Sequence, residues 1–405
     1  MDLLRQVGIE NFDSYCLKGR LFEREDDFIV QEIEENGEIL KVEREEQSKP
    51  LTEKNDYITF TLVKRGMSTP EAIKILSRNL HISVKRIAYN GNKDKRALTS
   101  QRVSIFKLEA ERLSIESERV FIRDIEYSNQ PCKIGRLYGN HFTVHIKDFD
   151  SNGVEINEIG ENLKKGIPNF YGPQRFGSAS LNIEVSKSIL NNDLKAAFYS
   201  LVLKERNESQ LNGDKRGELR KVFEGYLSDG IVDREKANEL LKFLPGFMYF
   251  ERESLSYLIE HKNDYAGAIR LMPKYIRLMI LQSFQYYIFN RTVSELLKKG
   301  EIRRIENIPT IGYDMKLDDS ETAGIIRNLM KEEGIEDPEK LKLKSMPEAS
   351  LKSFMHPAYF VPENFGISID GKDANIVFDL KKGSYATILL LKLFSENLLY
   401  SHGNS

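Results

Sequence analysis

The hydrophobic period of this chain changes twice, and this change limits the available folds more than any other feature. In the first third, apolar residues alternate in short runs that are typical of strands. After Gly177 they recur at three- and four-residue intervals, which indicates helices, and alternation returns at 375–380. The pattern predicts an α+β part with mainly antiparallel connections, interrupted by a helical insert and then resumed.

The expected elements follow from this period and from local start signals. Ser68-Thr69-Pro70-Glu71 combines a hydroxyl cap, a first-turn proline and an early acid, so it predicts the start of a helix. We expect strands at 28–33, 39–42, 57–63, 87–89, 103–106, 121–125, 142–146 and 375–380. We expect helices from 68 to about 80 and at 155–165, 181–205, 233–244, 252–262, 265–299, 319–342 and 384–398.

Cysteine usage and hydropathy restrict the class of protein. Cys16 and Cys132 lack Cys or His partners at zinc spacing, so we expect neither a disulfide framework nor a metal site, and a reducing cytoplasm fits. The N-terminus lacks the apolar run of a signal peptide. Since no run of 18 apolar residues occurs, we expect no membrane span.

The charge of the whole chain hides local differences. The 60 basic and 62 acidic residues give a net charge of −2, which by itself does not indicate a nucleic-acid partner. From Lys64 to Arg96, however, nine side chains are basic and two are acidic, and 133–147 and 265–294 contain basic residues without acids. Tyr89, Tyr138 and Phe142 lie among these segments. Such a mixture suits phosphates and bases, although each segment alone also fits a solvated helix face.

Three short motifs carry side chains that suit chemistry or base recognition. In the loop Asn90-Gly91-Asn92-Lys93-Asp94-Lys95-Arg96, neighbouring cations favour the ionised form of Asp94, which then suits a nucleophile or a base. Taken alone, an aspartate in an Asn-Gly loop more often serves the turn itself. Gly139-Asn140-His141-Phe142 fits base recognition or a turn with a core phenylalanine. The segment 168–177, PNFYGPQRFG, fits ligand contact or a packed interdomain corner.

Together these motifs resemble the TruD family of tRNA pseudouridine synthases. Residues 92–101, NKDKRALTSQ, are similar to the KDK-x-A-x-T-x-Q signature, and 139–142 to GNxF. Residues 168–177 resemble PNYFGxQRFG with Phe-Tyr in place of Tyr-Phe. Residues 25–30, EDDFIV, resemble PEDFxV, and 383–387, GSYAT, resemble the C-terminal element. The matches keep the family's order from residue 23 to residue 387.

The resemblance implies a fold, a reaction and a partner. The fold is α+β, a pseudouridine synthase catalytic domain at 1–168 and 361–405 that is interrupted by a mostly helical TRUD insertion domain at 169–360. The reaction isomerises a uridine in tRNA, uridine 13 of the D-arm in the family, without a metal or organic cofactor. We accordingly expect a cytoplasmic, monomeric enzyme whose partner is tRNA.

The resemblance also implies roles for single residues. Asp94 is the essential aspartate, acting as nucleophile at C1′ or as base in glycal formation, in a largely dry pocket that Lys93 supports. The target base is flipped out of its stack, and Phe142 and Tyr385 line its pocket. Phe28 fills the gap in the RNA or walls the site, and Asn140 binds the uracil edge or holds the aspartate loop. Three residues, Asn169, Arg175 and Phe176, contact RNA or form the domain junction.

This chain departs from the family at one charged position, and other functions stay open. Phe22 stands where the family often has a basic residue that pairs with the aspartate, so Arg20 or Arg24 is a candidate substitute. Two alternatives remain: a protein of the same fold that acts on another RNA, and a module that binds tRNA without catalysis. A phosphate-processing enzyme is disfavoured because the chain lacks a GxxxxGK[ST] motif.

Overall fold

The computed structural model describes residues 3–44, 51, 53–115, 117–177, 180–206 and 210–395. The chain forms two compact units. The sheet unit contains Asp13–Ile167 and Phe360–Ser405, and the helical unit contains Met1–Phe12 and Pro168–Tyr359. The chain passes between them after Phe12 and again within β8 (Ile167–Pro168) and β11 (Tyr359–Phe360). The helical unit is thus an insertion, to which the first residues of the chain also belong.

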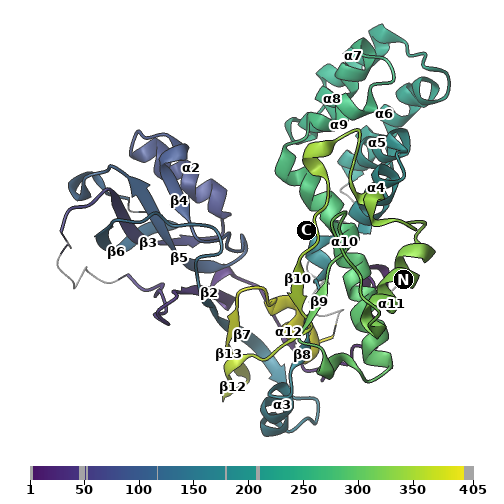
Figure 1. The fold of residues 1–405 in the computed structure, drawn as a ribbon. Coiled ribbons are helices and arrows are strands. Elements are labelled where there is room, and N and C mark those ends of the chain that lie inside the picture. Colours follow the sequence, from purple (N-terminus) through teal and green to yellow (C-terminus); the bar gives the residue numbers. More distant parts are fainter. Residues whose placement is uncertain are drawn as a thin grey trace. The chain divides into compact units, whose positions relative to one another are not determined.

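A mainly antiparallel sheet organises the described part of the sheet unit (Figure 1). Its nine described strands are β1 (Lys18–Arg20), β2 (Phe28–Ile33), β3 (Tyr57–Arg65), β4 (Ile87–Tyr89), β5 (Leu98–Phe106), β6 (Val120–Ser128), β7 (Gly139–Asp150), β12 (Glu363–Asp370) and β13 (Asp373–Lys381). The order is β12-β13-β7-β2-β5-β3-β6, with β1 paired to β7 and β4 to β5. Strands β2 and β5 pair in parallel, so their C-terminal ends lie at the same edge of the sheet.

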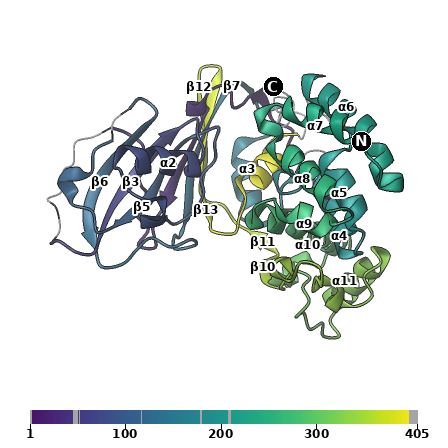
Figure 2. The ribbon, with the colours of Figure 1, turned by 90° about the horizontal axis from the view of Figure 1, so that it is seen from above.

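Helix α2 (Thr69–Asn79) closes one face of the strands β3, β5 and β6 (Figure 2). Ser68 caps it, since the Ser68 hydroxyl accepts from Glu71 N and the Glu71 carboxylate accepts from Ser68 N. Its apolar stripe, which includes Ile73 and Leu76, packs on Phe60 and other buried strand residues. Burying each such side chain contributes about 1.5–3 kcal/mol, so the stripe holds the helix on the sheet. Two further helices of this unit are α3 (Ile156–Leu163) and α12 (Ala386–Leu393).

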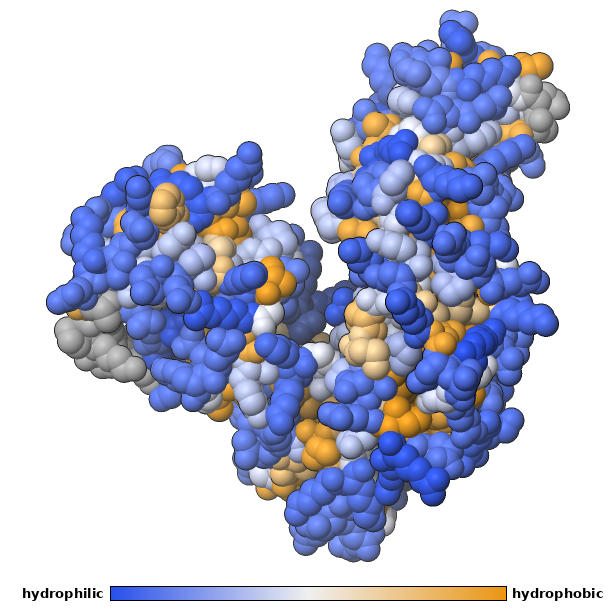
Figure 3. Space-filling model, in the orientation of Figure 1, coloured by the Kyte–Doolittle hydropathy of each residue, from blue (hydrophilic) through white to orange (hydrophobic). Residues whose placement is uncertain are grey.

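The helical unit is built around α10 (Lys274–Lys298), against which α4 and α11 pack. Its other described helices and its short strand pair are α1 (Leu3–Gln6), α4 (Leu181–Leu190), α5 (Leu194–Val202), α6 (Gln210–Asp229), α7 (Arg234–Lys242), α8 (Tyr249–Glu260), α9 (Tyr265–Arg270), α11 (Glu321–Glu332), β9 (Asn307–Pro309) and β10 (Met355–Pro357). None of the described helices of the chain has the length and apolar character of a membrane span. The visible face of each unit is mainly hydrophilic (Figure 3).

The expected α+β class is confirmed, and seven of the eight expected strands lie within observed ones. The strand expected at 39–42 is wrong, because only an isolated bridge joins Ile39 to Ile33. Strand β12 and helix α6 were not expected. Three of the eight residues of β12 are exposed and polar, and α6 has three glycines. Both nevertheless carry a hydrophobic period that the expectation did not use. Phe365, Ile367 and Ile369 alternate in β12, and apolar residues recur at helical spacing over 219–227 in α6.

Four helices expected from the sequence are shorter or divided. Residues 181–205 form α4 and α5, because Asn192 turns with a φ of 59° and Asp193 caps the second helix. Residues 265–299 divide before Pro273, and the acidic helix at 319–342 ends before Gly334, whose φ is 76°. Helix α12 covers 386–393 of the expected 384–398, and 396–398 lie outside the described residues.

The first twelve residues belong to the helical unit, whereas the expectation placed them in the catalytic part. Helix α10 provides the reason. The Asn290 side-chain amide donates to Val7 O at 2.9 Å, and the Ser294 hydroxyl donates to Gly8 O at 2.9 Å. The Glu10 amide in turn donates to the Ser294 hydroxyl. These contacts between distant parts of the chain leave no trace in the local pattern.

Candidate functional site

The Asp94 loop connects β4 to β5 in the sheet unit. Lys93 is buried, whereas Asp94, Lys95 and Arg96 are exposed. The expected pair Lys93–Asp94 therefore separates into an anchor and a displayed carboxyl group. A loop of this kind can present a reactive side chain only if its backbone is held in place.

Lys93 anchors the loop to β2 and β7. Its ammonium group lies 2.8 Å from Glu32 Oε2 in an ion pair whose two side chains are almost fully buried. The same group donates to Asn140 Oδ1 at 2.8 Å. Of the two roles expected for Asn140, this geometry supports holding the loop. Removing either charge would leave the other buried without compensation, which is strongly unfavourable.

Glu32 is the centre of a buried polar network. Its Oε1 accepts from Asn90 Nδ2 at 2.9 Å and from Arg102 N at 3.3 Å, and its Oε2 faces Lys93. The carboxylate thereby joins both ends of the segment 90–93 to the sheet. Because buried polar groups need hydrogen-bond partners, any other conformation of the loop would leave some of these groups unpaired. The network therefore favours a single loop conformation.

Lys64 holds the other side of the loop from β3. Its side chain is fully buried, and its ammonium group donates to Asp94 O and to Met67 O, each at 2.7 Å. The cation therefore fixes the backbone of the residue that carries the displayed carboxyl group. Burial lowers the pKa of Lys64 to about 8, although the nearby charge of Asp94 opposes this shift.

The Thr69 hydroxyl and the Gln101 side-chain amide complete the support of the loop. Thr69 Oγ1 accepts from Lys93 N at 2.9 Å and donates to Gln101 Oε1 at 2.8 Å. Gln101 Nε2 donates to Gly91 O at 3.1 Å. The glutamine of the KDK-x-A-x-T-x-Q pattern is therefore explained by this contact, in which a β5 side chain donates a hydrogen bond to the loop backbone.

The Lys64 ammonium group predicts a pH dependence of stability. Between about pH 8 and 10.5 the unfolded chain keeps a proton on this side chain that the folded chain has lost, so stability rises with pH. Unfolding in urea at pH 7.5 and pH 10 should show a gain of up to about 3 kcal/mol that Lys64→Met lacks. Lys74→Met, at an exposed lysine of α2, is the control. Parallel pH profiles for wild type and Lys64→Met would contradict the assignment.

An aromatic stack lies on the same sheet face as Glu32 and Asn140. Phe28 and Phe142 stack at 6.0 Å between ring centroids, and Phe142 stacks on Phe378 at 5.0 Å. Phe22 meets Phe28 edge to face at 5.3 Å. Register places these rings together, because Phe142 pairs with Phe378, and Val144, two residues further along β7, pairs with Phe28. Phe142 is buried in this stack, so it lies under the site rather than open at its surface.

Tyr385 stands at the N-terminus of α12, directly after β13. It is half-buried, and Ser384 N donates to Lys381 O in the preceding turn. Lys382 N donates to Tyr138 O, which places this turn beside the start of β7. The GSYAT segment is thus held next to the strand that carries Asn140 and supplies a ring that is partly open to solvent.

The segment 168–177 serves mainly the core of the helical unit. Asn169 and Phe176 are fully buried, and Tyr171 stacks on Tyr286 at 3.9 Å. Arg175 is exposed. Among the three residues expected at an RNA contact or domain junction, Arg175 therefore presents its side chain to solvent, and the other two pack.

Part of the local positive charge lies inside the protein. Lys64 and Lys93 are buried, and Arg277 is buried beside Glu348 at 3.3 Å. Arg20, a candidate partner for the aspartate, instead pairs with Glu23 and Asp148. The exposed basic side chains of 64–96 and 133–147 include Lys74, Arg78, Lys85, Lys95, Arg96, Lys133 and Arg136. This smaller set is the charge available to a polyanion.

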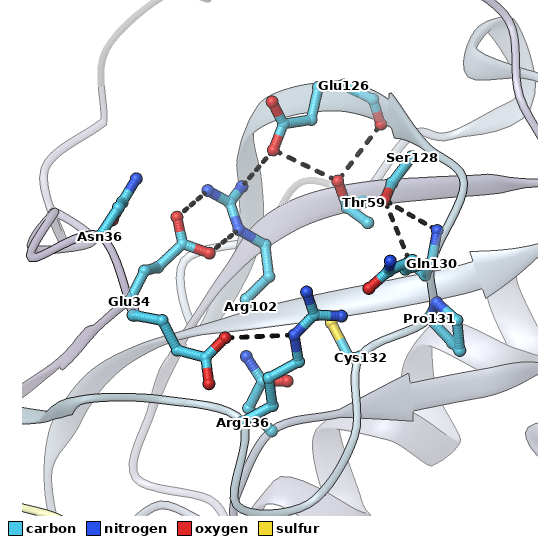
Figure 4. A pocket seen from close by; sticks show the side chains of 12 residues that line it. Glu34, Asn36, Thr59, Arg102, Glu126, Ser128, Gln130, Pro131, Cys132 and Arg136 are labelled. Carbon is cyan, nitrogen blue, oxygen red and sulfur yellow. Dashed lines mark hydrogen bonds and ion pairs between the residues drawn. The ribbon is translucent and has the colours of Figure 1, made fainter.

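A polar pocket of about 250 Å³ borders the loop at Asn90 (Figure 4). Arg102 forms a bidentate pair with Glu34 at 2.7 and 2.9 Å, and Arg136 pairs with Glu35 at 3.3 Å. Its walls thus satisfy much of their own charge. Cys132, whose thiol pKa burial raises to about 12, lines the same pocket, and Cys16 and Cys132 are both free thiols.

Comparison with known proteins places this geometry in a family. The sequence model of "tRNA pseudouridine synthase D (TruD)" matches residues 7–307 and 302–393, which is nearly the whole chain. The chain belongs to the TruD family. The TruD match includes the Asp94 loop, the strand start at 139–142 and the turn at 383–387, which all lie in the sheet unit.

Related TruD proteins match over the whole length. A "Probable tRNA pseudouridine synthase D" of Methanococcus vannielii is 29% identical and covers 96% of this chain and 99% of its own. Another of Archaeoglobus fulgidus is 28% identical over 97% of this chain and 99% of its own. A crystal structure from Methanosarcina mazei, described as "Putative tRNA pseudouridine synthase D (TruD)", has a TM-score of 0.70 at 26% identity, and the match covers 98% of both chains.

Several residues that organise the site did not stand out in the sequence. Glu32 and Lys64 lie in strands. A single charged residue in a strand is ordinarily expected to point to solvent, so neither was singled out. The apolar residues around them could have indicated burial, and a buried charged side chain needs a partner of opposite charge or a hydrogen-bonding group. Within the described ranges, three or more His, Cys, Asp or Glu side chains do not gather at any metal-binding spacing.

Proposed function

We propose that this protein isomerises a uridine in tRNA to pseudouridine, with Asp94 as the essential carboxyl group. Membership of the TruD family supports the reaction class. The observation that carries the assignment of Asp94 is its display on a loop that is held by Lys64 of β3 and by the ion pair between Glu32 of β2 and Lys93 of the loop. We further propose uridine 13 of the D-arm as the target, which is the family's expected position.

The reaction breaks one bond and forms another at the same sugar carbon. The N1–C1′ bond of uridine breaks, the base turns, and C5 bonds to C1′. The hydrogen on C5 then leaves to solvent, and N1 takes a proton. Asp94 serves as nucleophile that bonds to C1′ until C5 displaces it, or as base that removes the C2′ proton and returns it when C5 bonds to C1′. Either role uses its ionised form, and the buried cation of Lys64 at its backbone favours negative charge at this place.

The sheet face beside the loop suits a flipped base. In this proposal Tyr385 stacks on the uracil, and Phe142 supports the floor of the pocket from within the stack of rings. Lys93 and Asn140 hold the loop, and Phe28 walls the site. Arg175 contributes an exposed cation for RNA from the other unit, whereas Asn169 and Phe176 maintain the packing that supports it.

The two ring substitutions are expected to differ. Tyr385→Ala should lower single-turnover rates roughly 10- to 100-fold, because the flipped uracil loses its stacking partner. Stability should stay near normal, since the Tyr385 ring is only half-buried. Phe142→Ala should in addition lower the free energy of unfolding by about 3–5 kcal/mol, since it empties a buried ring site. Rates and urea unfolding measure both effects. Equal losses of stability in the two variants would contradict the placement of these rings.

Incubation with tRNA transcripts tests the function itself. Chemical mapping of pseudouridine should give one modified position that depends on protein, and the product should form equally in EDTA. A position other than 13 would correct the target and keep the reaction. RNA binding without product under all conditions would instead support a binding module, and would contradict the proposed function.

A further inference from the structure

The turn Lys133–Arg136 carries an exposed aliphatic side chain beside the Asp94 loop. Arg136 N donates to Lys133 O at 2.9 Å, and Gly135 has a φ of 86°. These are the features of a type II turn, in which Ile134 takes the outer corner. Its side chain is 66% exposed, the largest value among the large hydrophobic residues described in the sheet unit. A single exposed aliphatic residue is ordinary and does not by itself indicate a function, so the groups around Ile134 decide whether it has one.

The turn is fastened directly to the Asp94 loop. Asn90 receives two of its hydrogen bonds, from Lys133 N to Oδ1 at 3.1 Å and from Gly135 N to the carbonyl oxygen at 2.7 Å. The other end of the Asn90 side chain donates to Glu32 in the buried network. Ile134 therefore stands on a support shared with Lys93 and Asp94 and is held in position relative to them.

Positive charge surrounds this aliphatic tip. Lys133 and Arg136 flank it in sequence, and the Lys382 ammonium group donates to Gly135 O at 3.0 Å. Glu35 pairs with Arg136 at 3.3 Å and offsets part of this charge. Cations around an apolar tip suit a nucleic acid, whose phosphates bind the cations while the tip meets the bases.

The Phe28 ring does not have this freedom. It lies between Phe22 and Phe142, at 5.3 and 6.0 Å, within the stack of the sheet face. Inserting it into RNA would break both contacts. The expectation that Phe28 fills the gap left by a flipped base is therefore poorly supported by its packing, whereas Ile134 already projects from a fixed turn.

We propose that Ile134 is a wedge that enters the RNA stack next to the flipped uridine. The inference rests on the proposed function, because a wedge serves a reaction that needs an extruded base. Ile134 occupies the place that the target base leaves, and Lys133, Arg136 and Lys382 hold the adjoining phosphates. It is a positioning residue and takes no part in bond making.

Rates on two kinds of RNA test the wedge. Ile134→Ala should lower the single-turnover rate on folded tRNA by roughly tenfold or more, and should have little effect on a short unstructured RNA with the same target sequence. Ile134→Leu should restore most of the rate on tRNA. Ile369→Ala is the matched control, because Ile369 is 55% exposed at the far end of β12, beside Asp370.

A second readout follows the stack itself. In complexes formed with the Asp94→Asn background, 2-aminopurine next to the target should become brighter on binding, and Ile134→Ala should remove most of that gain. Equal rate losses on both RNAs, or an unchanged rate on tRNA with unchanged fluorescence, would overturn the wedge while the function stands. Absence of product with wild-type protein on every tRNA would overturn the proposed function instead.

Discussion

Replacing Asp94 by asparagine is expected to abolish pseudouridine formation, lowering the single-turnover rate roughly 10⁴-fold or more. The substitution keeps the size of the side chain and removes its ability to act as nucleophile or base. The loop should stay in place, because Lys64 and Thr69 hold its backbone atoms and Lys93 anchors it to Glu32 and Asn140. The measurement is pseudouridine formed per tRNA under excess enzyme.

Controls separate chemistry from folding and binding in this variant. The free energy of unfolding and the affinity for tRNA should both remain near wild type. Lys95→Met removes a neighbouring exposed charge and should mainly weaken RNA binding in a salt-dependent way. Normal turnover by Asp94→Asn would show that another group does the chemistry.

Lys93→Met is expected to lower the free energy of unfolding by about 3–5 kcal/mol. The substitution leaves the Glu32 carboxylate buried without its cation and takes a hydrogen bond from Asn140. Product formation should fall as well, because the loop loses its attachment to β2 and β7. Urea unfolding and single-turnover rates at one pH measure the two effects.

The double variant Glu32→Gln with Lys93→Met separates charge from position. It removes both buried charges, so most of the lost stability should return. Activity should stay low, since the loop is still not anchored. If stability does not recover, or if the double variant regains wild-type activity, the ion pair does not position the loop.

The sequence motifs indicated candidate site residues, and they did not show how these residues are arranged. The loop 92–101 drew attention to Lys93 and Asp94 as a pair, yet Lys93 turns into the protein to meet Glu32. Local sequence shows which charges are neighbours along the chain, and it does not show which strand lies beneath them. Lys64 contacts Asp94 O across 30 residues for this reason, and only the register of β3 with β5 brings them together.

Hydrophobic period predicted most of the fold, and it failed where other forces decide. The division at Asn192 depended on a capping aspartate. The attachment of residues 1–12 to α10 rests on hydrogen bonds from Asn290 and Ser294, which no local pattern records.

Release of the C5 hydrogen tests the central claim most directly. A tRNA transcript carrying tritium at C5 of uridine loses one tritium for each uridine converted, because C5 takes the bond to C1′. Wild-type protein should release tritium in proportion to one uridine per tRNA, and Asp94→Asn should release none above background. No release by wild-type protein, or equal release by the variant, would contradict an isomerase centred on Asp94.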